Sequence, residues 1–116
     1  MASKRRESFA CPVDVTLSLI KGKWKPMILW QLSAQKRRFT DFQVALPKVA
    51  HKVLSQQLRR LEADGLIRRA VSKTSAVTVV YELTDFGRTL RPALNALASW
   101  GKTHYRPKAV DARSSM

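Results

Sequence analysis

The stretch that decides the fold is residues 39–65, which read FTDFQVALPKVAHKVLSQQLRRLEADG. Its first part carries the signals of a helix start. Thr40 can cap the helix, Gln43 can reach back in a capping box, and Phe39 stands at the position of a hydrophobic staple. A proline follows closely and disfavours helical geometry at the residue before it, so we expect a short helix over Asp41–Leu46.

A longer amphipathic helix is predicted over Ala50–Asp64, after a turn of about four residues. Leu54, Leu58 and Leu61 recur at helical spacing, and Gly65 supplies a C-terminal stop. A short helix, a tight turn and a longer amphipathic helix form the helix-turn-helix arrangement, whose second helix lies in the major groove of DNA.

Beyond this helix the pattern changes to a strand period. We expect a first strand over Leu66–Val71, a polar turn at Ser72–Ser75 and a second strand over Ala76–Leu83. In the second strand, apolar residues alternate on one face: Val77, Val79, Tyr81 and Leu83. A β-hairpin directly after a helix-turn-helix makes the winged form of that fold.

Helices are predicted on both sides of this unit. Two lie upstream, over Cys11–Ile20 and Trp24–Leu32, and Thr84 caps a downstream helical stretch in which Pro92 predicts a bend or break. In so small a protein, apolar residues on a terminal helix more often pair with a second chain than cover a core. The residues assigned to a dimer interface are Leu90, Leu94, Leu97 and Trp100.

The expected fold is therefore mainly α with a small β-hairpin, a winged helix-turn-helix that dimerises through its terminal helices. Residues 1–10 form a basic N-terminal arm, and residues 11–105 form the winged helix-turn-helix domain with its C-terminal dimerisation helix. Residues 106–116 have little apolar content and are expected to form a flexible tail.

Composition limits the possible functions. The 116 residues include 22 Lys and Arg against 8 Asp and Glu, a net charge of +14 that attracts nucleic acid, anionic membranes or acidic proteins. The apolar runs are far shorter than the roughly 20 residues that cross a bilayer, and no secretory signal is visible, so we expect a cytoplasmic protein with no membrane partner. One cysteine and two distant histidines predict no metal site, and no phosphate loop or nucleophile elbow suggests a cofactor or an enzyme.

The face of the predicted recognition helix opposite its leucines carries side chains suited to DNA. Lys52, Gln56 and Arg59 lie along it, with Ser55 and Arg60 beside them, and no carboxylate falls on this strip. Arg and Lys can pair with guanine edges or phosphates, and Gln can pair with adenine. Such a face is also common on ordinary soluble helices, so the interpretation depends on the neighbouring helix, the hairpin and the overall charge.

Other candidate DNA contacts surround this helix. His51 opens it and is expected to contact DNA or solvent. Further candidates lie in the preceding helix, the connector and the hairpin, each with a solvated role as the alternative: Thr40, Lys36, Arg37, Arg38, Arg68, Arg69 and Lys73. The rival function is a non-specific architectural protein, which would use the same charge on nucleic acid without a dimer or a preferred operator.

Several motifs in order resemble the HxlR family of bacterial winged helix-turn-helix regulators. They are CPVD at 11–14, GKWK at 22–25, FTDF at 39–42, QLRRLEADGL at 57–66 and YELT at 81–84, and the resemblance extends from Cys11 to about Gly101. It implies a homodimeric transcription factor, often a repressor, that dimerises through terminal helices and places two long helices in successive major grooves. Two-fold symmetry then predicts a pseudo-palindromic operator with half-sites roughly 10 base pairs apart.

The sequence departs from the family pattern at the recognition helix and in the hairpin. Ala50 stands where the family usually has a small hydroxyl residue, so a helix cap must come from elsewhere or be missing. The second strand lacks the usual prolines and basic residue, which leaves wing contacts to DNA open. Val80 replaces the usual glutamate and makes the hairpin more apolar than the family pattern, as a packing partner would require.

Cys11 is the candidate sensor. It lies at the apparent N-terminus of the first helix, near a basic segment, where a thiolate is stabilised, although a small buried hydrophobe is the commoner fate of a free cysteine. The resemblance implies that a cysteine at this position can sense oxidants or electrophiles. The competing model is a small-molecule effector in an apolar pocket walled by Trp24, Trp30 or Trp100.

Overall fold

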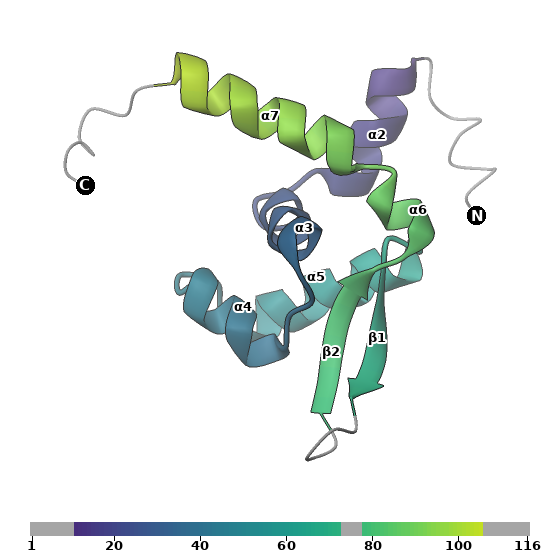
Figure 1. The fold of residues 1–116 in the computed structure, drawn as a ribbon, viewed down its shortest axis with the longest axis vertical. Coiled ribbons are helices and arrows are strands. Elements are labelled where there is room, and N and C mark those ends of the chain that lie inside the picture. Colours follow the sequence, from purple (N-terminus) through teal and green to yellow (C-terminus); the bar gives the residue numbers. More distant parts are fainter. Residues whose placement is uncertain (1–10, 73–77, 106–116) are drawn as a thin grey trace.

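The computed structural model describes residues 11–72 and 78–105 (Figure 1). The elements follow one another as α2 (Pro12–Ile20), α3 (Lys25–Ala34), α4 (Phe39–Ala45), α5 (His51–Ala63), β1 (Ile67–Ser72), β2 (Thr78–Leu83), α6 (Asp85–Arg88) and α7 (Arg91–His104). The expected mainly helical, winged helix-turn-helix chain is confirmed. The predicted N-terminal arm and C-terminal tail lie outside the described residues. No helix in the described part could span a bilayer.

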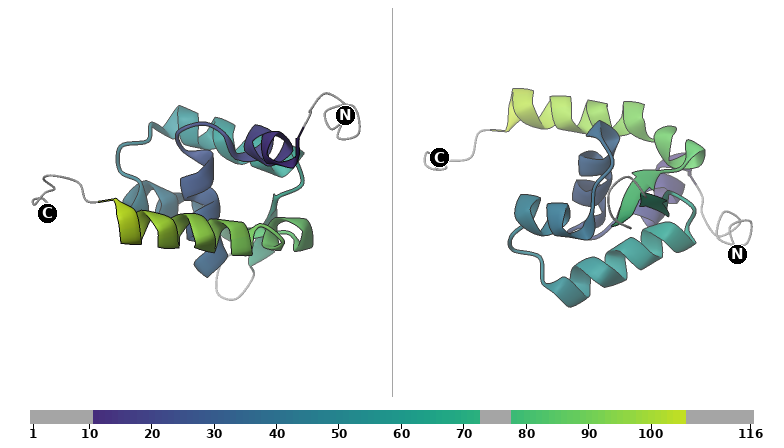
Figure 2. Two further views of the ribbon diagram at one scale, coloured as in Figure 1. Left: turned by 90° about the horizontal axis from the view of Figure 1, so that it is seen from above. Right: turned by 60° about the horizontal axis from the view of Figure 1, so that its bottom comes forward.

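The core forms where α3 runs through the middle of the domain, between α7 on one side and α4 and α5 on the other (Figure 2). The apolar stripe of α5 is fully covered, as its spacing predicts. Buried side chains come from every layer: Ile28, Leu29, Leu32, Phe42, Leu54, Leu58, Leu61, Leu66, Ile67, Leu83 and Leu94. The exposed face of α5 is therefore fixed by burial of the opposite face.

The wing is an antiparallel pair of strands in which Ile67 pairs with Leu83 and Ser72 with Thr78. The described strands are each six residues long, and the predicted start of the second strand at Ala76 lies outside the described residues. Leu83, on the expected apolar face of the second strand, is buried. Val79 on the same face is exposed, because the outer half of the hairpin extends beyond the body of the domain. The predicted position Val77 lies outside the described residues.

The start of α4 differs from the sequence prediction. The helix begins at Phe39, with Arg38 as its N-cap, so Thr40 is inside the first turn and neither Thr40 nor Gln43 makes the expected capping box. Asp41 takes this role, because its Oδ2 accepts a hydrogen bond from the backbone N–H of Arg38 at 2.8 Å. An ionised carboxylate in the first turn also interacts favourably with the helix dipole, which explains why the helix starts earlier.

The C-terminal helical stretch breaks into α6 and α7 at Thr89 and Leu90, near Pro92, as expected. The predicted cap is also confirmed, since Thr84 Oγ1 accepts a hydrogen bond from the Gly87 N–H at 2.9 Å. Leu94 was expected at a dimer interface, but it is only 3% exposed and belongs to the core of this chain. It points inward because α7 packs across α3.

Candidate nucleic-acid interface

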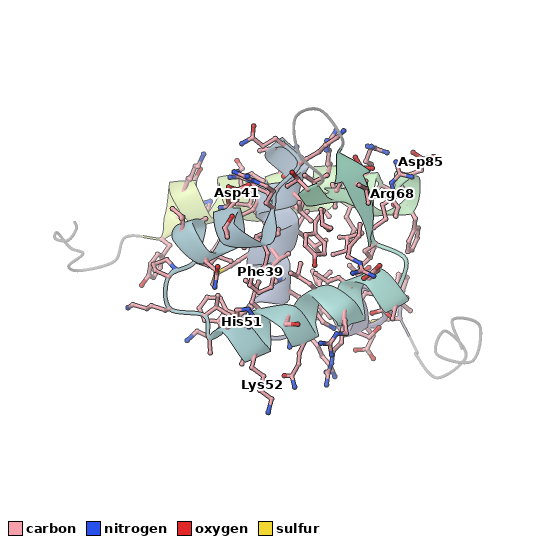
Figure 3. All side chains as sticks on the ribbon, turned by 90° about the horizontal axis from the view of Figure 1, so that it is seen from below. Phe39, Asp41, His51, Lys52, Arg68 and Asp85 are labelled. Atoms are coloured by element: carbon pink, nitrogen blue, oxygen red, sulfur yellow. The ribbon has the colours of Figure 1, made fainter. Side chains whose placement is uncertain are left out.

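The second helix of the helix-turn-helix presents a polar outer strip, which we define as Lys52, Ser55, Gln56, Arg59 and Arg60. All except Ser55, which is half-buried, are exposed. Figure 3 shows Lys52 projecting away from the body of the domain, on the side where α4 and α5 lie in front. The structure therefore brings the predicted base-reading residues together on one accessible face.

The cations of the outer strip keep their charge available. Within residues 11–72 and 78–105, no carboxylate lies within ion-pairing distance of Lys52, Arg59 or Arg60. The Nη2 of Arg59 donates a hydrogen bond to Ser55 Oγ at 3.2 Å, one helical turn earlier. Arg59 is thus oriented by a neutral partner, and its remaining guanidinium donors can meet a base edge or a phosphate.

The N-terminus of α5 is held without a side-chain cap. Ala50 is the N-cap residue and contributes no side-chain hydrogen bond, as the substitution of alanine at this position predicts. Instead, the ring of His51 lies against the ring of Phe39 from α4, with centroids 4.7 Å apart and planes tilted by 46°. The preceding Val49 is buried beneath the turn. Aromatic and apolar contacts therefore fix the point where the recognition helix begins.

The basic residues at the base of the wing have carboxylate partners. Glu82 on β2 is only 6% exposed and accepts a 2.6 Å hydrogen bond from Arg68 Nε, while Arg68 Nη2 lies 2.5 Å from the same oxygen. Its other oxygen lies 3.5 Å from the Nζ of Lys36, in the connector between α3 and α4. On the opposite face of the hairpin, Arg69 pairs with Glu62 of α5 at 3.4 Å. We call these five residues the wing base.

The connector is fixed to the wing by its backbone as well. Arg37 forms an isolated antiparallel bridge with Tyr81. The Tyr81 N–H donates to the Arg37 carbonyl oxygen at 2.7 Å, and the Arg37 N–H donates to the Tyr81 carbonyl oxygen at 3.0 Å. Arg38 lies 3.8 Å from Asp41 across one helical turn. The three predicted connector contacts are thus engaged within the chain. The remaining predicted wing contact, Lys73, lies outside the described residues.

Sequence reasoning overlooked Glu82. Alternation along β2 does not single it out, but its register does, because it stands directly across from Arg68 in the hairpin. Burial alone would raise the pKa of Glu82, but the hydrogen bond and charge of Arg68, together with Lys36, outweigh burial and hold this pKa below its ordinary value. The neighbouring Tyr81 has a raised pKa, caused mainly by burial.

Cys11 lies at the other end of the fold. It is the N-cap residue of α2 and is exposed, with Pro12 at the first helical position. The alternative of a small buried hydrophobe is therefore wrong for this chain. The exposed sulfur is therefore accessible to reagents in solution.

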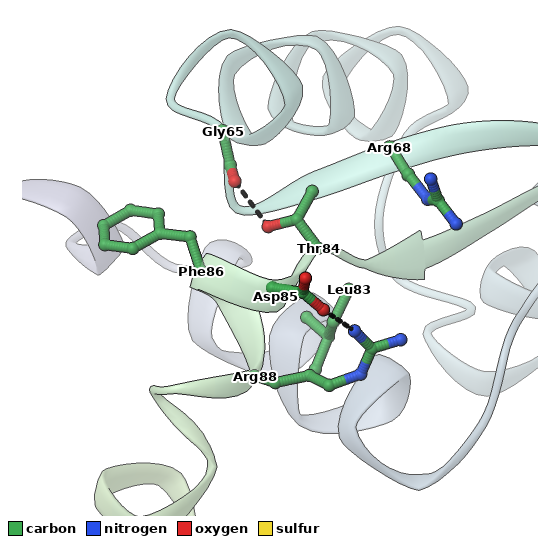
Figure 4. Close-up of a pocket in the computed structure, with 7 residues that line it drawn as sticks. All are labelled: Gly65, Arg68, Leu83, Thr84, Asp85, Phe86 and Arg88. Carbon is green, nitrogen blue, oxygen red and sulfur yellow. Dashed lines mark hydrogen bonds and ion pairs between the residues drawn. The ribbon is translucent and has the colours of Figure 1, made fainter.

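An open pocket of about 400 Å³ lies at the junction of α5, the wing and α6 (Figure 4). Thr84 Oγ1 donates a hydrogen bond to the Gly65 carbonyl at 2.6 Å, and Arg88 pairs with Asp85 at 2.8 Å. The seven lining residues include none of the three tryptophans proposed for an effector pocket: Gly65, Arg68, Leu83, Thr84, Asp85, Phe86 and Arg88. This pocket therefore lends no support to the tryptophan-walled model.

Comparison with known proteins identifies the family. Residues 19–109 match the model of the HxlR-like helix-turn-helix family. The chain is 45% identical over 94 residues to an uncharacterized HTH-type transcriptional regulator of Bacillus subtilis (strain 168), YdeP, covering 81% of this chain and 73% of that protein.

Solved structures give the same answer. The redox regulator HypR in its oxidized form has a TM-score of 0.77 and 39% identity, covering 84% of this chain and all of that one (100%). The reduced form of the transcriptional regulator YodB from B. subtilis has a TM-score of 0.71 and 26% identity, covering 85% and 98% of the two chains. The chain therefore belongs to the HxlR-like helix-turn-helix family of DNA-binding transcriptional regulators.

Proposed function

We propose that this regulator is a sequence-specific repressor that binds a pseudo-palindromic operator as a homodimer and inserts α5 of each subunit into the major groove. The observation that carries the proposal is the outer strip of α5, where Lys52, Gln56 and Arg59 are accessible and the cations have no carboxylate partner among the described residues. Gln and Arg are the side chains that form bidentate pairs with adenine and guanine, so this face supports sequence-specific binding over simple charge attraction.

Exposed apolar side chains on the terminal helices support dimerisation. Leu97 and Trp100 of α7 are 58% and 65% exposed, and Val13 and Leu17 of α2 are also exposed. Both helices lie at the end of the molecule opposite the hairpin (Figure 1), so a partner bound there would leave α5 free. Apolar surface of this kind is costly to leave in water and is typical of interfaces. Leu90 is half-buried, so it contributes mainly to the subunit core.

We further propose that oxidation or electrophile modification of Cys11 controls DNA binding. The thiol is exposed at a helix N-terminus, and the similar proteins HypR and YodB are described as a redox regulator and as reduced and diamide-treated forms of a regulator. With one cysteine per chain, the oxidised product is a disulfide between subunits, a mixed disulfide or a sulfenic acid.

The test begins with selection of duplexes from a random pool by the purified protein, followed by electrophoretic shifts with random DNA as competitor. Wild type and Cys11→Ser are compared before and after diamide. Release of the wild type alone would support the redox-switched operator binder. Specific binding that ignores diamide in both would exclude this thiol switch and direct the search to a small-molecule effector. Equal competition by random DNA would support the architectural alternative instead.

A further inference from the structure

The rings of Phe39 in α4 and His51 in α5 are in contact at the start of the recognition helix. Phe39 is the first residue of α4 and is half-buried against the core, whereas His51 is the first residue of α5 and is exposed. Figure 3 shows the two side chains facing one another across the gap between the helices. The Phe39 ring is therefore anchored against the core. The His51 ring has one face against Phe39 and remains accessible to solvent.

This contact acts at a helix end that has no side-chain cap. Ala50 supplies no cap, so no side-chain oxygen at the N-cap fixes the first turn of α5. The Val49 N–H donates to the Leu46 carbonyl at 3.1 Å, which orders the turn but leaves the imidazole direction undetermined. The tilted ring contact at 4.7 Å restricts the rotamers of His51, because an aromatic face favours a limited set of ring geometries.

We propose that Phe39 is a positioning residue that holds the His51 imidazole so that its nitrogen edge meets a base edge at the operator. This inference rests on the proposed operator binding by α5. A preset side chain loses less rotamer freedom on binding, so the contact raises affinity for the correct sequence. Phe39 acts through His51 and does not itself touch DNA.

The test uses two substitutions of the ring. Phe39→Leu keeps an apolar side chain but removes the aromatic face, whereas Phe39→Tyr keeps the face. We expect Phe39→Leu and His51→Ala each to lower the ratio of affinities for a selected duplex over a scrambled one about tenfold, with Phe39→Tyr close to wild type. Phe86→Leu is the matched control, because it removes an exposed phenyl ring from α6, beside the C-terminal end of α5 and not the N-terminal end that carries His51.

The double variant separates positioning from general packing. If Phe39 acts only through His51, Phe39→Leu combined with His51→Ala loses no more discrimination than His51→Ala alone. Proton NMR adds an independent readout, since the ring-current shift of the His51 imidazole should vanish in Phe39→Leu and persist in Phe39→Tyr. Thermal unfolding of each variant identifies any loss of fold.

Several outcomes would overturn the inference. They are wild-type discrimination in Phe39→Leu, equal losses in the Leu and Tyr variants, or losses that multiply in the double variant. Failure of the wild-type protein to select any sequence would instead overturn the proposed operator binding. The two failures are therefore distinguishable in one set of measurements.

Discussion

The outer strip of α5 and the wing base are both rich in cations, but the two regions hold them differently. On α5, Lys52 and Arg60 have no carboxylate within ion-pairing distance in the described part of the chain. At the wing base, Arg68 and Arg69 each pair with a carboxylate, and Glu82 pairs with a second cation as well. The first region keeps its charge free for a ligand, and the second uses its charge to join segments of the fold.

This difference shows that net charge overestimates the number of phosphate contacts. The net charge of +14 attracts DNA as a whole. A cation already bound to a carboxylate must lose that partner or share it before it meets a phosphate, so it contributes less to binding than a free one. We therefore expect α5 to supply most of the sequence discrimination and the wing base to supply mainly geometry.

The largest expected effect is on folding, at the junction beneath the wing base. A Cβ built on Gly87 would lie 2.0 Å from the backbone oxygen of Leu66, which cannot move without displacing β1. Gly87→Ala should therefore lower the free energy of unfolding by about 3 kcal/mol. Urea unfolding followed by circular dichroism measures the loss.

Gly101→Ala is the matched control for this substitution. Nothing lies within 4 Å of a Cβ built on Gly101, which is inside α7. Alanine favours a helix interior over glycine, so this variant should gain up to about 1 kcal/mol. Equal stability of the two alanine variants would show that the junction tolerates movement and does not fix the wing.

The next effect concerns base reading on α5. Gln56→Ala and Arg59→Ala should each weaken binding to a selected operator by about 2 kcal/mol while changing binding to random DNA much less. Arg68→Ala is the comparison variant from the wing base, and we expect its small loss to be equal on both DNAs. Titration by fluorescence anisotropy on the two duplexes measures the ratio. Equal losses for Gln56→Ala and Arg59→Ala would mean that these side chains contact only the backbone of DNA.

A smaller effect is expected on the salt dependence of DNA affinity, which should differ between variants of an unpaired cation and of a paired one. Affinity should fall with salt with a slope of about 0.9 per phosphate contacted, so Lys52→Ala should lower the slope by about one contact. Arg68→Ala should leave the slope nearly unchanged, because Glu82 already neutralises this guanidinium. Binding measured across a series of potassium chloride concentrations tests both. A slope that falls equally in both variants would contradict the division between the two regions.

The spacing of residues in the sequence predicted the buried and exposed faces of α5. Leucines at helical spacing predicted the buried face of α5, and the position of its outer strip followed from the same geometry. Ala50 likewise predicted that the side chain at this position would not cap the helix. These features are local or repeat along one helix, so a single sequence contains enough information to place them.

The features that the sequence did not give are pairings between distant residues. The sequence pattern predicts Thr40 as the helix cap, but Asp41 accepts a hydrogen bond from the Arg38 backbone N–H, and the helix begins at Phe39. Leu94 matched an interface pattern, yet it packs in the chain's own core because α7 crosses α3. The buried carboxylate of Glu82 required knowledge of strand register and of the approach of Lys36. Each of these outcomes depends on tertiary packing, which overrides local preference.

The smallest expected effect is the dependence of stability on pH at the wing base. Because the pKa of Glu82 lies below its ordinary value of 4.5, folding favours the ionised form. The stability from this group is fully present above pH 4.5 and is lost as the pH falls through the lower pKa of the folded state. The loss should be modest, because Arg68 and Lys36 are mostly exposed to solvent.

Glu82→Gln tests this linkage at one group. The variant should be less stable than wild type at neutral pH, and the difference should narrow as the pH falls below 4.5, where the wild-type carboxyl takes up a proton. Urea unfolding of both proteins at a series of pH values measures it. Asp85→Asn is the matched control, because Asp85 pairs with Arg88 on the exposed surface of α6, where screening makes an ion pair weak. A constant difference between Glu82→Gln and wild type across this range would mean that the wing base is held by shape and hydrogen bonding, with no contribution from the charge of Glu82.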